Sequence, residues 1–345
     1  MKKPIITFKP KQAVKELLSP LSTRAQDIMK RRYGLGADTK HQTLESIGTT
    51  YGITRERVRQ IENFSLATIR RSDEFRQNEA VFMELRDVMK EYGGIIRESD
   101  FLEYLSTDKS YQNYIHFVLV VGDYFERLRE DDDFHHRWTV DKTLALKVEE
   151  ALRFLHKELE ETDLVSEKEM IERFIKHLKK DLHDIKDSNV ARRWLSLSKK
   201  IGKNPLGDWG VSHSPNIKAR GIRDLAYLIL RDHGSPMHFR EVAKRIEEKF
   251  EKKAHQATVH NELIKDRRFV LVGRGLYALA EWGYKPGIVR SVIKEILQST
   301  GPLKREEVVE RVLKERHVKE NTILVNLQNS KHFRKDKNGR YSLVS

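Results

Sequence analysis

The chain has 345 residues, of which 38% are apolar and 34% are charged, and its mean hydropathy is -0.65. At roughly 100–200 residues per domain, this length predicts two or three ordinary domains, or more if they are small. No apolar stretch approaches the roughly 20 residues that a membrane-spanning helix needs, and the N-terminal residues lack the apolar core of a secretion signal. The absence of cysteine excludes disulfides, Cys-ligated metals and Cys nucleophiles.

The net charge of +14 is distributed unevenly along the chain. Residues 1–76 carry 16 Lys and Arg against 8 Asp and Glu, residues 77–165 carry 11 against 21, and residues 166–345 carry 39 against 23. A chain this basic favours polyanionic partners, most often nucleic acid. The acidic middle segment predicts a separate module that either faces away from DNA or contacts a protein, and a merely solvated charged surface is the alternative.

The first 33 residues predict a flexible arm followed by two helices. Residues 1–12 hold four lysines and are expected to form a flexible basic arm. Apolar residues then recur at helical spacing from residue 13 to residue 33. Ser19-Pro20 interrupts this run, and Ser22 or Thr23 can cap the second helix.

Residues 43–71 predict two short helices joined by a tight turn. Thr43 is a good N-cap for the first helix, and Gly52 in the sequence Tyr-Gly-Ile can supply a positive φ. Thr54 caps the second helix, whose buried stripe is expected to follow helical spacing. Two helices joined in this way form a helix-turn-helix. The residues of the buried stripe are Val58, Ile61, Ser65 and Ile69.

The outer face of the second helix carries Arg55, Glu56, Arg59 and Gln60. These are long side chains with several hydrogen-bonding atoms, the kind that read base edges in the major groove of DNA. We therefore expect this helix to recognise a DNA sequence. An amphipathic hairpin with a solvated charged face is the alternative.

The same residues resemble a known family. The run TRERVRQIE at 54–62 and the preceding TLESIG at 43–48 resemble region 4 of primary bacterial sigma factors, over about residues 13–75. The resemblance implies that the four outer residues face the promoter −35 element and that Thr54 and Arg57 contact phosphates or support the turn. It also implies that residues 13–35 dock on the β-flap of RNA polymerase.

The resemblance has two limits. The sequence Asn-Phe-Ser at 63–65 stands where the family usually has a basic helix end, which leaves some backbone contacts open. No segment resembles the sigma regions that bind and melt the −10 element. A complete sigma factor is therefore not expected.

The remaining chain predicts a repeat of about 70 residues. Four segments share a turn, a helix, a second helix and a closing strand-like stretch with an aromatic residue. These closing aromatics, which lie 64 to 71 residues apart, are Trp138, Trp209, Tyr277 and Tyr341. In the last copy Asn338-Gly339 is a strong hairpin signal. Helices followed by a hairpin at this size indicate winged helices.

The third copy resembles a second known family. Residues 236–242 and 266–279 are similar to the HARE-HTH domain, a winged helix also found in the delta subunit of bacterial RNA polymerase. The predicted fold class is mainly α with short β-hairpin wings, a helix-turn-helix followed by tandem winged-helix domains. The predicted segments are a flexible basic arm (1–12), a region 4-like head (13–76), an acidic winged-helix-like module (77–145), a second winged-helix-like module (146–215), a HARE-HTH domain (221–284) and a C-terminal winged helix (286–345).

Basic residues gather near the second helices and wings of the last three copies. Lys and Arg at such places are expected to bind the DNA backbone without reading its sequence, although HARE-type domains can bind protein instead. The predicted backbone residues in these copies are Arg192, Arg193, Lys199, Lys200, Lys203, Lys265, Arg267, Arg268, Arg274, Lys331, Arg334, Lys335, Lys337 and Arg340.

We expect no enzyme, no cofactor and no metal site. The sequence Gly-Arg-Gly at 273–275 lacks the third glycine of a dinucleotide-binding loop. His135-His136, beside three aspartates at 131–133, lacks a further histidine at a metal-ligand spacing.

The sequence thus predicts a bacterial transcription regulator that binds double-stranded DNA in the cytoplasm, at the nucleoid, and has no contact with a membrane. Two alternatives stay open: an accessory factor that binds RNA polymerase, and a non-specific architectural protein of the nucleoid. The sequence leaves the oligomeric state open.

Overall fold

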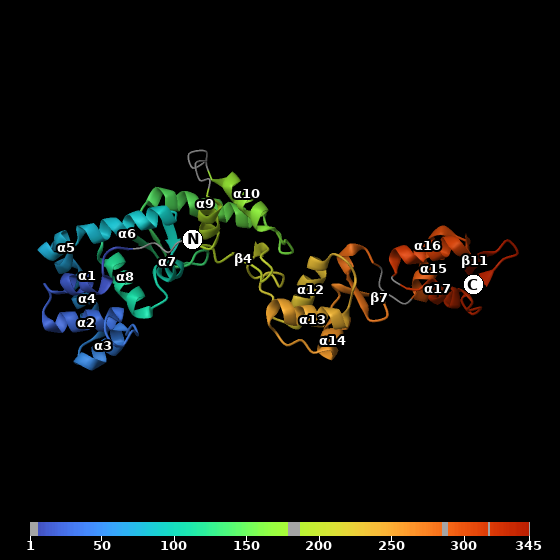
Figure 1. The fold of residues 1–345 in the computed structure, drawn as a ribbon, viewed down its shortest axis with the longest axis horizontal. Coiled ribbons are helices and arrows are strands. Elements are labelled where there is room, and N and C mark those ends of the chain that lie inside the picture. Colours follow the sequence, from blue (N-terminus) through green and yellow to red (C-terminus); the bar gives the residue numbers. More distant parts are fainter. Residues whose placement is uncertain (1–5, 179–186, 285–288, 317, 345) are drawn as a thin grey trace. The chain divides into compact units, whose positions relative to one another are not determined.

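The computed structural model describes residues 6–178, 187–284, 289–316 and 318–344 (Figure 1). It is mainly helical with small antiparallel sheets, which confirms the predicted fold class. The chain packs as two compact units: unit 1 holds residues 1–202 and 209–212, and unit 2 holds residues 203–208 and 213–345. Among the described helices, none is both long and apolar enough to cross a membrane.

Unit 1 begins with the four helices of the head. Pro10 opens the first helix, so residues 10–12 of the predicted flexible arm are helical, while residues 1–5 lie outside the described residues. Ser22 caps the second helix by accepting a hydrogen bond from the Ala25 amide, and Gly34 ends it with a φ of 61°. The helices are α1 Pro10–Leu18, α2 Thr23–Tyr33, α3 Leu44–Tyr51 and α4 Arg55–Arg71.

The acidic segment that follows forms a winged helix. Its three strands are ordered β1-β3-β2, and both outer strands run antiparallel to the central β3. Ile95 and Glu126 both face Thr139 across this sheet. The elements are α5 Asp73–Gln77, α6 Glu79–Tyr92, β1 Ile95–Arg97, α7 Glu98–Leu105, α8 Lys109–Val121, β2 Glu126–Leu128 and β3 Arg137–Thr139.

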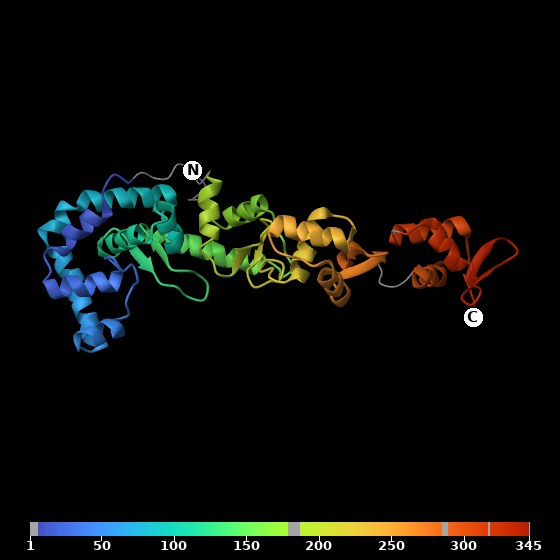
Figure 2. The ribbon, with the colours of Figure 1, turned by 60° about the horizontal axis from the view of Figure 1, so that its bottom comes forward.

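Helix α8 joins this winged helix to the head (Figures 1 and 2). It packs against α1, α2 and α4, and most of its residues are buried. Leu17 of α1 and Phe117 of α8 are both fully buried and belong to the same hydrophobic cluster. The Asn113 amide adds hydrogen bonds to the carbonyls of Gly34 and Thr39. The head and the acidic segment therefore share one core.

A second winged-helix-like module completes unit 1. Its helix α11 lies against β1 of the preceding module, where the Trp194 indole donates to the Gly93 carbonyl at 3.0 Å. The sequence predicted a helix over 189–200, but this helix ends at Leu195, because Ser198 forms a β-bridge with Phe134. The elements are α9 Lys142–Glu158, α10 Glu167–His177, α11 Ser188–Leu195, β4 Ile201–Lys203 and β5 Trp209–Val211.

Unit 2 contains two further winged helices, each described by itself. In the first, the sheet order is β6-β8-β7, and in the second it is β10-β11-β9. The predicted hairpin at Asn338-Gly339 is present, with a φ of 79° at Gly339. The first comprises α12 Ile222–His233, β6 Met237–His238, α13 Phe239–Phe250, α14 Gln256–Lys265, β7 Phe269–Gly273 and β8 Leu276–Leu279. The second comprises α15 Val289–Thr300, β9 Leu303–Lys304, α16 Arg305–Glu315, α17 Glu320–Leu327, β10 Phe333–Lys335 and β11 Arg340–Leu343.

The four closing aromatics occupy the same place in each copy. Trp138 lies in β3, Trp209 in β5, Tyr277 in β8 and Tyr341 in β11, each the last strand of its sheet. The first three are buried and Tyr341 is half-buried. The 64- to 71-residue spacing thus measures the structural repeat.

Candidate nucleic-acid interface

The turn between α3 and α4 is held by caps at both helix starts. The Thr43 hydroxyl accepts a hydrogen bond from the Ser46 amide, and the Thr54 hydroxyl accepts one from the Arg57 amide, each at 3.1 Å. Between them Gly52 adopts a φ of 62°, a conformation that glycine takes without strain. All three features agree with the sequence, so the start of α4 is fixed by local chemistry.

The inner side of α4 is held by two cores. Val58 packs with Ile28 and Ile47 in a small cluster inside the head, and Ile69 joins the core shared with α8. Ser65 is buried as predicted, whereas Ile61 is only half-buried. Burial of this stripe sets which face of α4 points outward.

The outward face carries all four residues predicted to read bases, and each is exposed. The Arg59 guanidinium donates to both carboxylate oxygens of Glu56, at 2.9 and 2.6 Å. This hydrogen bonding lowers the pKa of Glu56, so Glu56 remains ionised. Arg57 donates to the Gln60 amide oxygen at 3.1 Å. Exposed pairs of this kind are weak, so base edges and phosphates can replace them.

We expect Gly48→Ala to destabilise the helix-turn-helix. A Cβ at Gly48 would lie 2.6 Å from the backbone carbonyl oxygen of Ile53, and this backbone cannot move aside without displacing α4. Thermal unfolding should show a loss of about 1 kcal/mol or more. Gly52→Asn is the matched control, because the space around Gly52 is open and Asn tolerates a positive φ. Equal stability of Gly48→Ala and the wild type would contradict the observed turn.

The residues predicted to bind the DNA backbone fall into two groups. Most are exposed, and these are Thr54, Arg57, Lys203, Lys265, Arg267, Arg274, Lys331, Arg334, Lys335, Lys337 and Arg340. The others, which are half-buried, are Arg192, Arg193, Lys199, Lys200 and Arg268.

Four of the half-buried residues are held by contacts within the protein. Arg192 pairs with Glu167, and Arg193 donates to the Tyr92 carbonyl at 2.7 Å while lying over the Tyr92 ring. The Lys199 ammonium donates to the Asp131 carbonyl at 2.8 Å. Arg268 pairs with Asp224 and with Asp266, at 2.9 and 2.7 Å. Their internal contacts give these side chains a structural role.

The second helices of the two winged-helix modules in unit 1 are used for packing. Helix α8 is buried against the head, and α11 lies on β1. A winged helix usually presents its second helix to DNA, so these two modules do not offer that surface. In unit 2, α14 and α17 each bury only two residues, which leaves their outer faces available.

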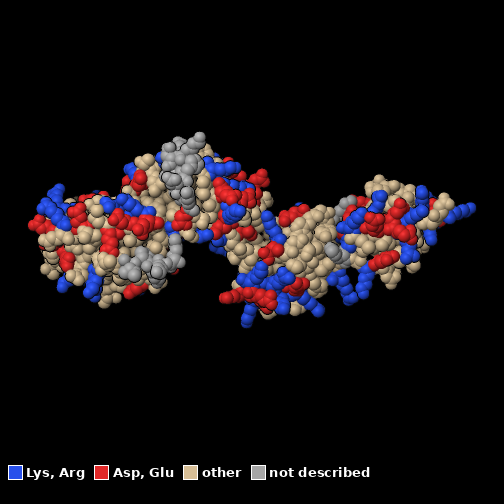
Figure 3. Space-filling view, turned by 45° about the horizontal axis from the view of Figure 1, so that its top comes forward, with Lys and Arg blue, Asp and Glu red and all other residues tan. Residues whose placement is uncertain are grey.

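The wing of the C-terminal domain is the most basic of the described wings. Lys335, Lys337 and Arg340 lie in or beside β10 and β11 and are exposed. Figure 3 shows Lys and Arg side chains at the tip of this wing, at the right of the view, and mixed charges over the rest of the visible face. The HARE-like wing carries only Arg274 between β7 and β8.

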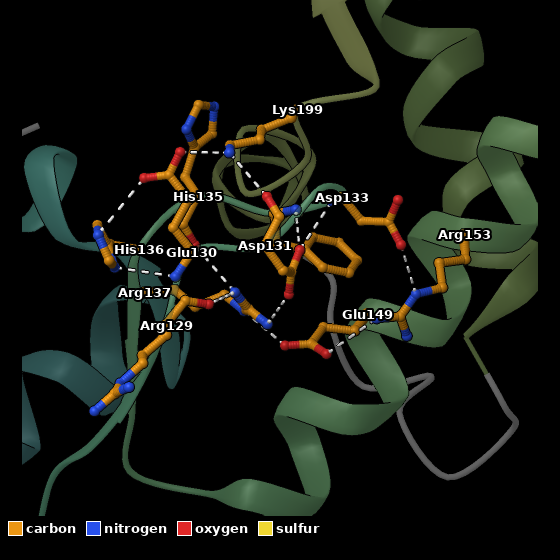
Figure 4. A network of polar contacts seen from close by, with 11 residues as sticks. Arg129, Glu130, Asp131, Asp133, His135, His136, Arg137, Glu149, Arg153 and Lys199 are labelled. Carbon is orange, nitrogen blue, oxygen red and sulfur yellow. Dashed lines mark hydrogen bonds and ion pairs between the residues drawn. The ribbon is translucent and has the colours of Figure 1, made fainter.

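A network of ion pairs joins the two winged-helix modules of unit 1 (Figure 4). At its centre Arg137 and Glu149 are buried and lie 2.6 Å apart. Arg137 also donates to the carbonyls of Arg129 and His135, and its guanidinium lies over the Phe134 ring. Within the described residues no three His, Asp or Glu are placed to hold a metal ion, so we assign this network a structural role.

Comparison with known proteins identifies two domains. Residues 17–71 match the family described as sigma-70, region 4, and residues 221–282 match HARE-HTH, a helix-turn-helix domain described from ASXL and restriction endonuclease proteins. The chain is 36% identical over 67 residues to the RNA polymerase sigma factor SigA of Listeria monocytogenes, covering 19% of this chain and 18% of SigA. It is 48% identical over 54 residues to the sigma factor SigA1 of Synechococcus elongatus, covering 16% and 13%.

The chain spans less than a fifth of the length of these sigma factors. The similarity therefore concerns one domain. Both matched families are DNA-binding helix-turn-helix domains, in agreement with the exposed face of α4. The protein thus carries a sigma-70 region 4 helix-turn-helix at residues 17–71 and a HARE-HTH domain at residues 221–282.

Proposed function

We propose that this protein is a sequence-specific DNA-binding regulator of transcription, which places α4 in the major groove of a promoter −35-type site. One observation carries the proposal. Arg55, Glu56, Arg59 and Gln60 are displayed together on the outer face of a helix whose start, turn and inner face are fixed. The exposed basic residues of unit 2 add affinity for the backbone, because linked weak sites act at high effective concentration.

The proposal includes the site of action and excludes catalysis. Such a protein acts at the bacterial nucleoid, in the cytoplasm, with double-stranded DNA as its partner. It needs no enzyme activity and no cofactor. The arrangement of α4 supports binding and offers no catalytic group.

Selection from a random pool tests the proposal. Full-length protein is incubated with duplexes that carry a randomised segment, and the bound fraction is sequenced over several rounds. We expect enrichment of one short motif, and the Arg55→Ala protein should lose that motif. Bound duplexes without a common motif would contradict sequence recognition and would support the architectural alternative.

Binding to RNA polymerase is a second candidate, supported by the similarity of residues 17–71 to sigma factors. The structure limits how residues 13–35 can take part. Val14, Leu17 and Met29 are buried in the core shared with α8, so the apolar side of these helices is covered. A polymerase contact must use the exposed polar side or displace α8. Retention of polymerase core enzyme by the immobilised protein in the absence of DNA would support this candidate.

Neutralising the C-terminal wing should weaken the dependence of DNA binding on salt. Each lost phosphate contact lowers the slope of log affinity against log salt by about 0.9, so Lys335→Gln with Lys337→Gln should lower it by about 1.8. Fluorescence anisotropy across a salt series measures the slope. Lys314→Gln is the control, because Lys314 lies on α16 and pairs with Glu310 at 2.8 Å. An unchanged slope in the double variant would remove the wing from the DNA interface.

A further inference from the structure

Unit 1 contains a cavity of about 610 Å³ between the head and the acidic winged helix. Its walls come from α2, α4, α7, α8 and the β2–β3 region. This volume is within the range of small-molecule sites, which is about 300–1,000 Å³. The lining residues are Arg32, Tyr33, His41, Glu62, Arg70, Glu98, Leu102, Lys109, Gln112, Asn113, His116, Val120, Phe125, Arg127 and Trp138.

The mouth of this cavity is basic. Of the lining residues, the exposed ones are His41, Arg70, Lys109 and Arg127, and the two carboxylates are both largely buried. Lys109 is the least constrained of the four, because its ammonium makes a single described hydrogen bond, to Gln112 at 3.0 Å. Positive charge at an opening attracts anions and raises their local concentration.

The floor of the cavity is aromatic and polar. Tyr33, Phe125 and Trp138 are buried there. The Trp138 indole and the Arg127 guanidinium hold Glu98 with three hydrogen bonds of 2.8 Å. Burial alone would raise the pKa of Glu98, but the neighbouring His116 and Arg127 lower it to about 2, so Glu98 is a fixed carboxylate acceptor.

His116 projects into this floor without a hydrogen bond. Its side chain is 12% exposed, and neither ring nitrogen is hydrogen-bonded to any other described residue. Nε2 lies 3.7 Å from Glu98, beyond hydrogen-bond distance. The rings of Tyr33, His41 and Trp138 surround it at centroid distances of 5.9 to 6.2 Å. A buried imidazole is normally satisfied, so this one is suited to a bound polar group.

We propose that this cavity binds a nucleotide, with the phosphates at the basic mouth and the base between the aromatic residues of the floor. Each part of the cavity matches one part of that ligand. Lys109 and His41 meet negative charge, Tyr33 and Trp138 offer aromatic surface, and His116 and Glu98 can hydrogen-bond the base. Inorganic phosphate would use only the mouth, and a nucleoside only the floor.

The position of the cavity couples this ligand to the recognition helix. Glu62 and Arg70 belong to α4, whereas Lys109 and His116 belong to α8. A nucleotide would therefore contact both sides of the core that holds α4. This inference goes beyond DNA binding and does not rest on it, because nucleotide affinity is measured without DNA.

Isothermal titration calorimetry of the full-length protein tests the inference with four probes: ATP, GTP, adenosine and pyrophosphate. We expect ATP or GTP to bind at least about tenfold more tightly than adenosine and pyrophosphate, because only a nucleotide uses both parts of the cavity. No binding of either nucleotide up to millimolar concentration would overturn the proposal. Equal affinity for pyrophosphate and ATP would also overturn it, by showing a simple anion site.

Two variants locate the binding to this cavity. Lys109→Gln should weaken nucleotide affinity by about tenfold, because a hydrogen bond to a charged group is lost. His116→Phe keeps an aromatic ring and removes both nitrogens, and it should weaken binding with an unchanged melting temperature. Lys90→Gln on α6 is the matched control, because Lys90 is exposed and outside the cavity. Unchanged affinity in both cavity variants would place the nucleotide elsewhere and overturn the proposal.

Discussion

Arg59→Ala is expected to abolish most of the preference for a −35-type duplex over a scrambled one. Arg59 is exposed on the outer face of α4, and its guanidinium already makes a two-point contact with the Glu56 carboxylate. The same two-point geometry matches the edge of guanine in the major groove. Affinity for the specific duplex should fall by about 1–3 kcal/mol, while affinity for the scrambled duplex stays nearly constant. Fluorescence anisotropy on both duplexes measures the difference.

The control for this experiment is Arg71→Ala. Arg71 is exposed near the other end of α4, so its removal deletes the same charge far from the proposed base contacts. Arg71→Ala should preserve the preference between the two duplexes. An equal loss on specific and scrambled DNA with Arg59→Ala would show that Arg59 contacts only the backbone.

Glu149→Ala is expected to cause the largest loss of stability among the changes considered. Removal of this carboxylate leaves the Arg137 guanidinium buried, with a side chain 5% exposed, and without its closest anionic partner. Breaking a buried ion pair in this way typically costs about 3–5 kcal/mol. Unfolding can be followed by tryptophan fluorescence, because three of the four tryptophans, Trp138, Trp194 and Trp209, belong to unit 1.

Two further variants separate charge burial from side-chain loss. Glu172→Ala removes an exposed carboxylate of α10 and should change stability by less than about 0.5 kcal/mol. Arg137→Met combined with Glu149→Leu removes both charges and should recover much of the stability lost in Glu149→Ala. A loss below about 1 kcal/mol in Glu149→Ala would mean that other contacts, such as Asp131, suffice to compensate Arg137.

The helix-turn-helix could be predicted from sequence because local chemistry determines it. Thr43 and Thr54 cap the helices through hydrogen bonds to amides three residues ahead, and Gly52 adopts the backbone conformation that suits glycine. The four closing aromatics were likewise predictable, because each lies in the last strand of a repeated unit. These features depend on residues close together in the chain.

Features that depend on distant contacts were not predictable in the same way. The burial of α8 arises from packing against three helices of the head, although its apolar sequence was visible. The end of α11 depends on a bridge from Ser198 to Phe134, which no local breaker announces. Arg192 and Arg268 looked like backbone-binding residues until their partners, Glu167 and Asp224, were placed beside them.

The cavity between α4 and α8 belongs to the same class. Its lining residues extend from Arg32 to Trp138 and come from two predicted domains, so no sequence motif contains them. His116 lies within a nearly continuous apolar run and gave no sign of a binding role by itself. Only the packing of the acidic winged helix against the head brings its imidazole beside Tyr33 and Glu98.

The most direct test of sequence recognition is a fluorescence anisotropy titration of the full-length protein across a salt series. It compares a duplex carrying a promoter −35 element with a scrambled duplex of the same composition. Recognition through the outer face of α4 predicts a preference of about a hundredfold or more for the −35 duplex at physiological salt. Equal affinity for both duplexes, with the same steep salt dependence, would contradict sequence recognition by this protein.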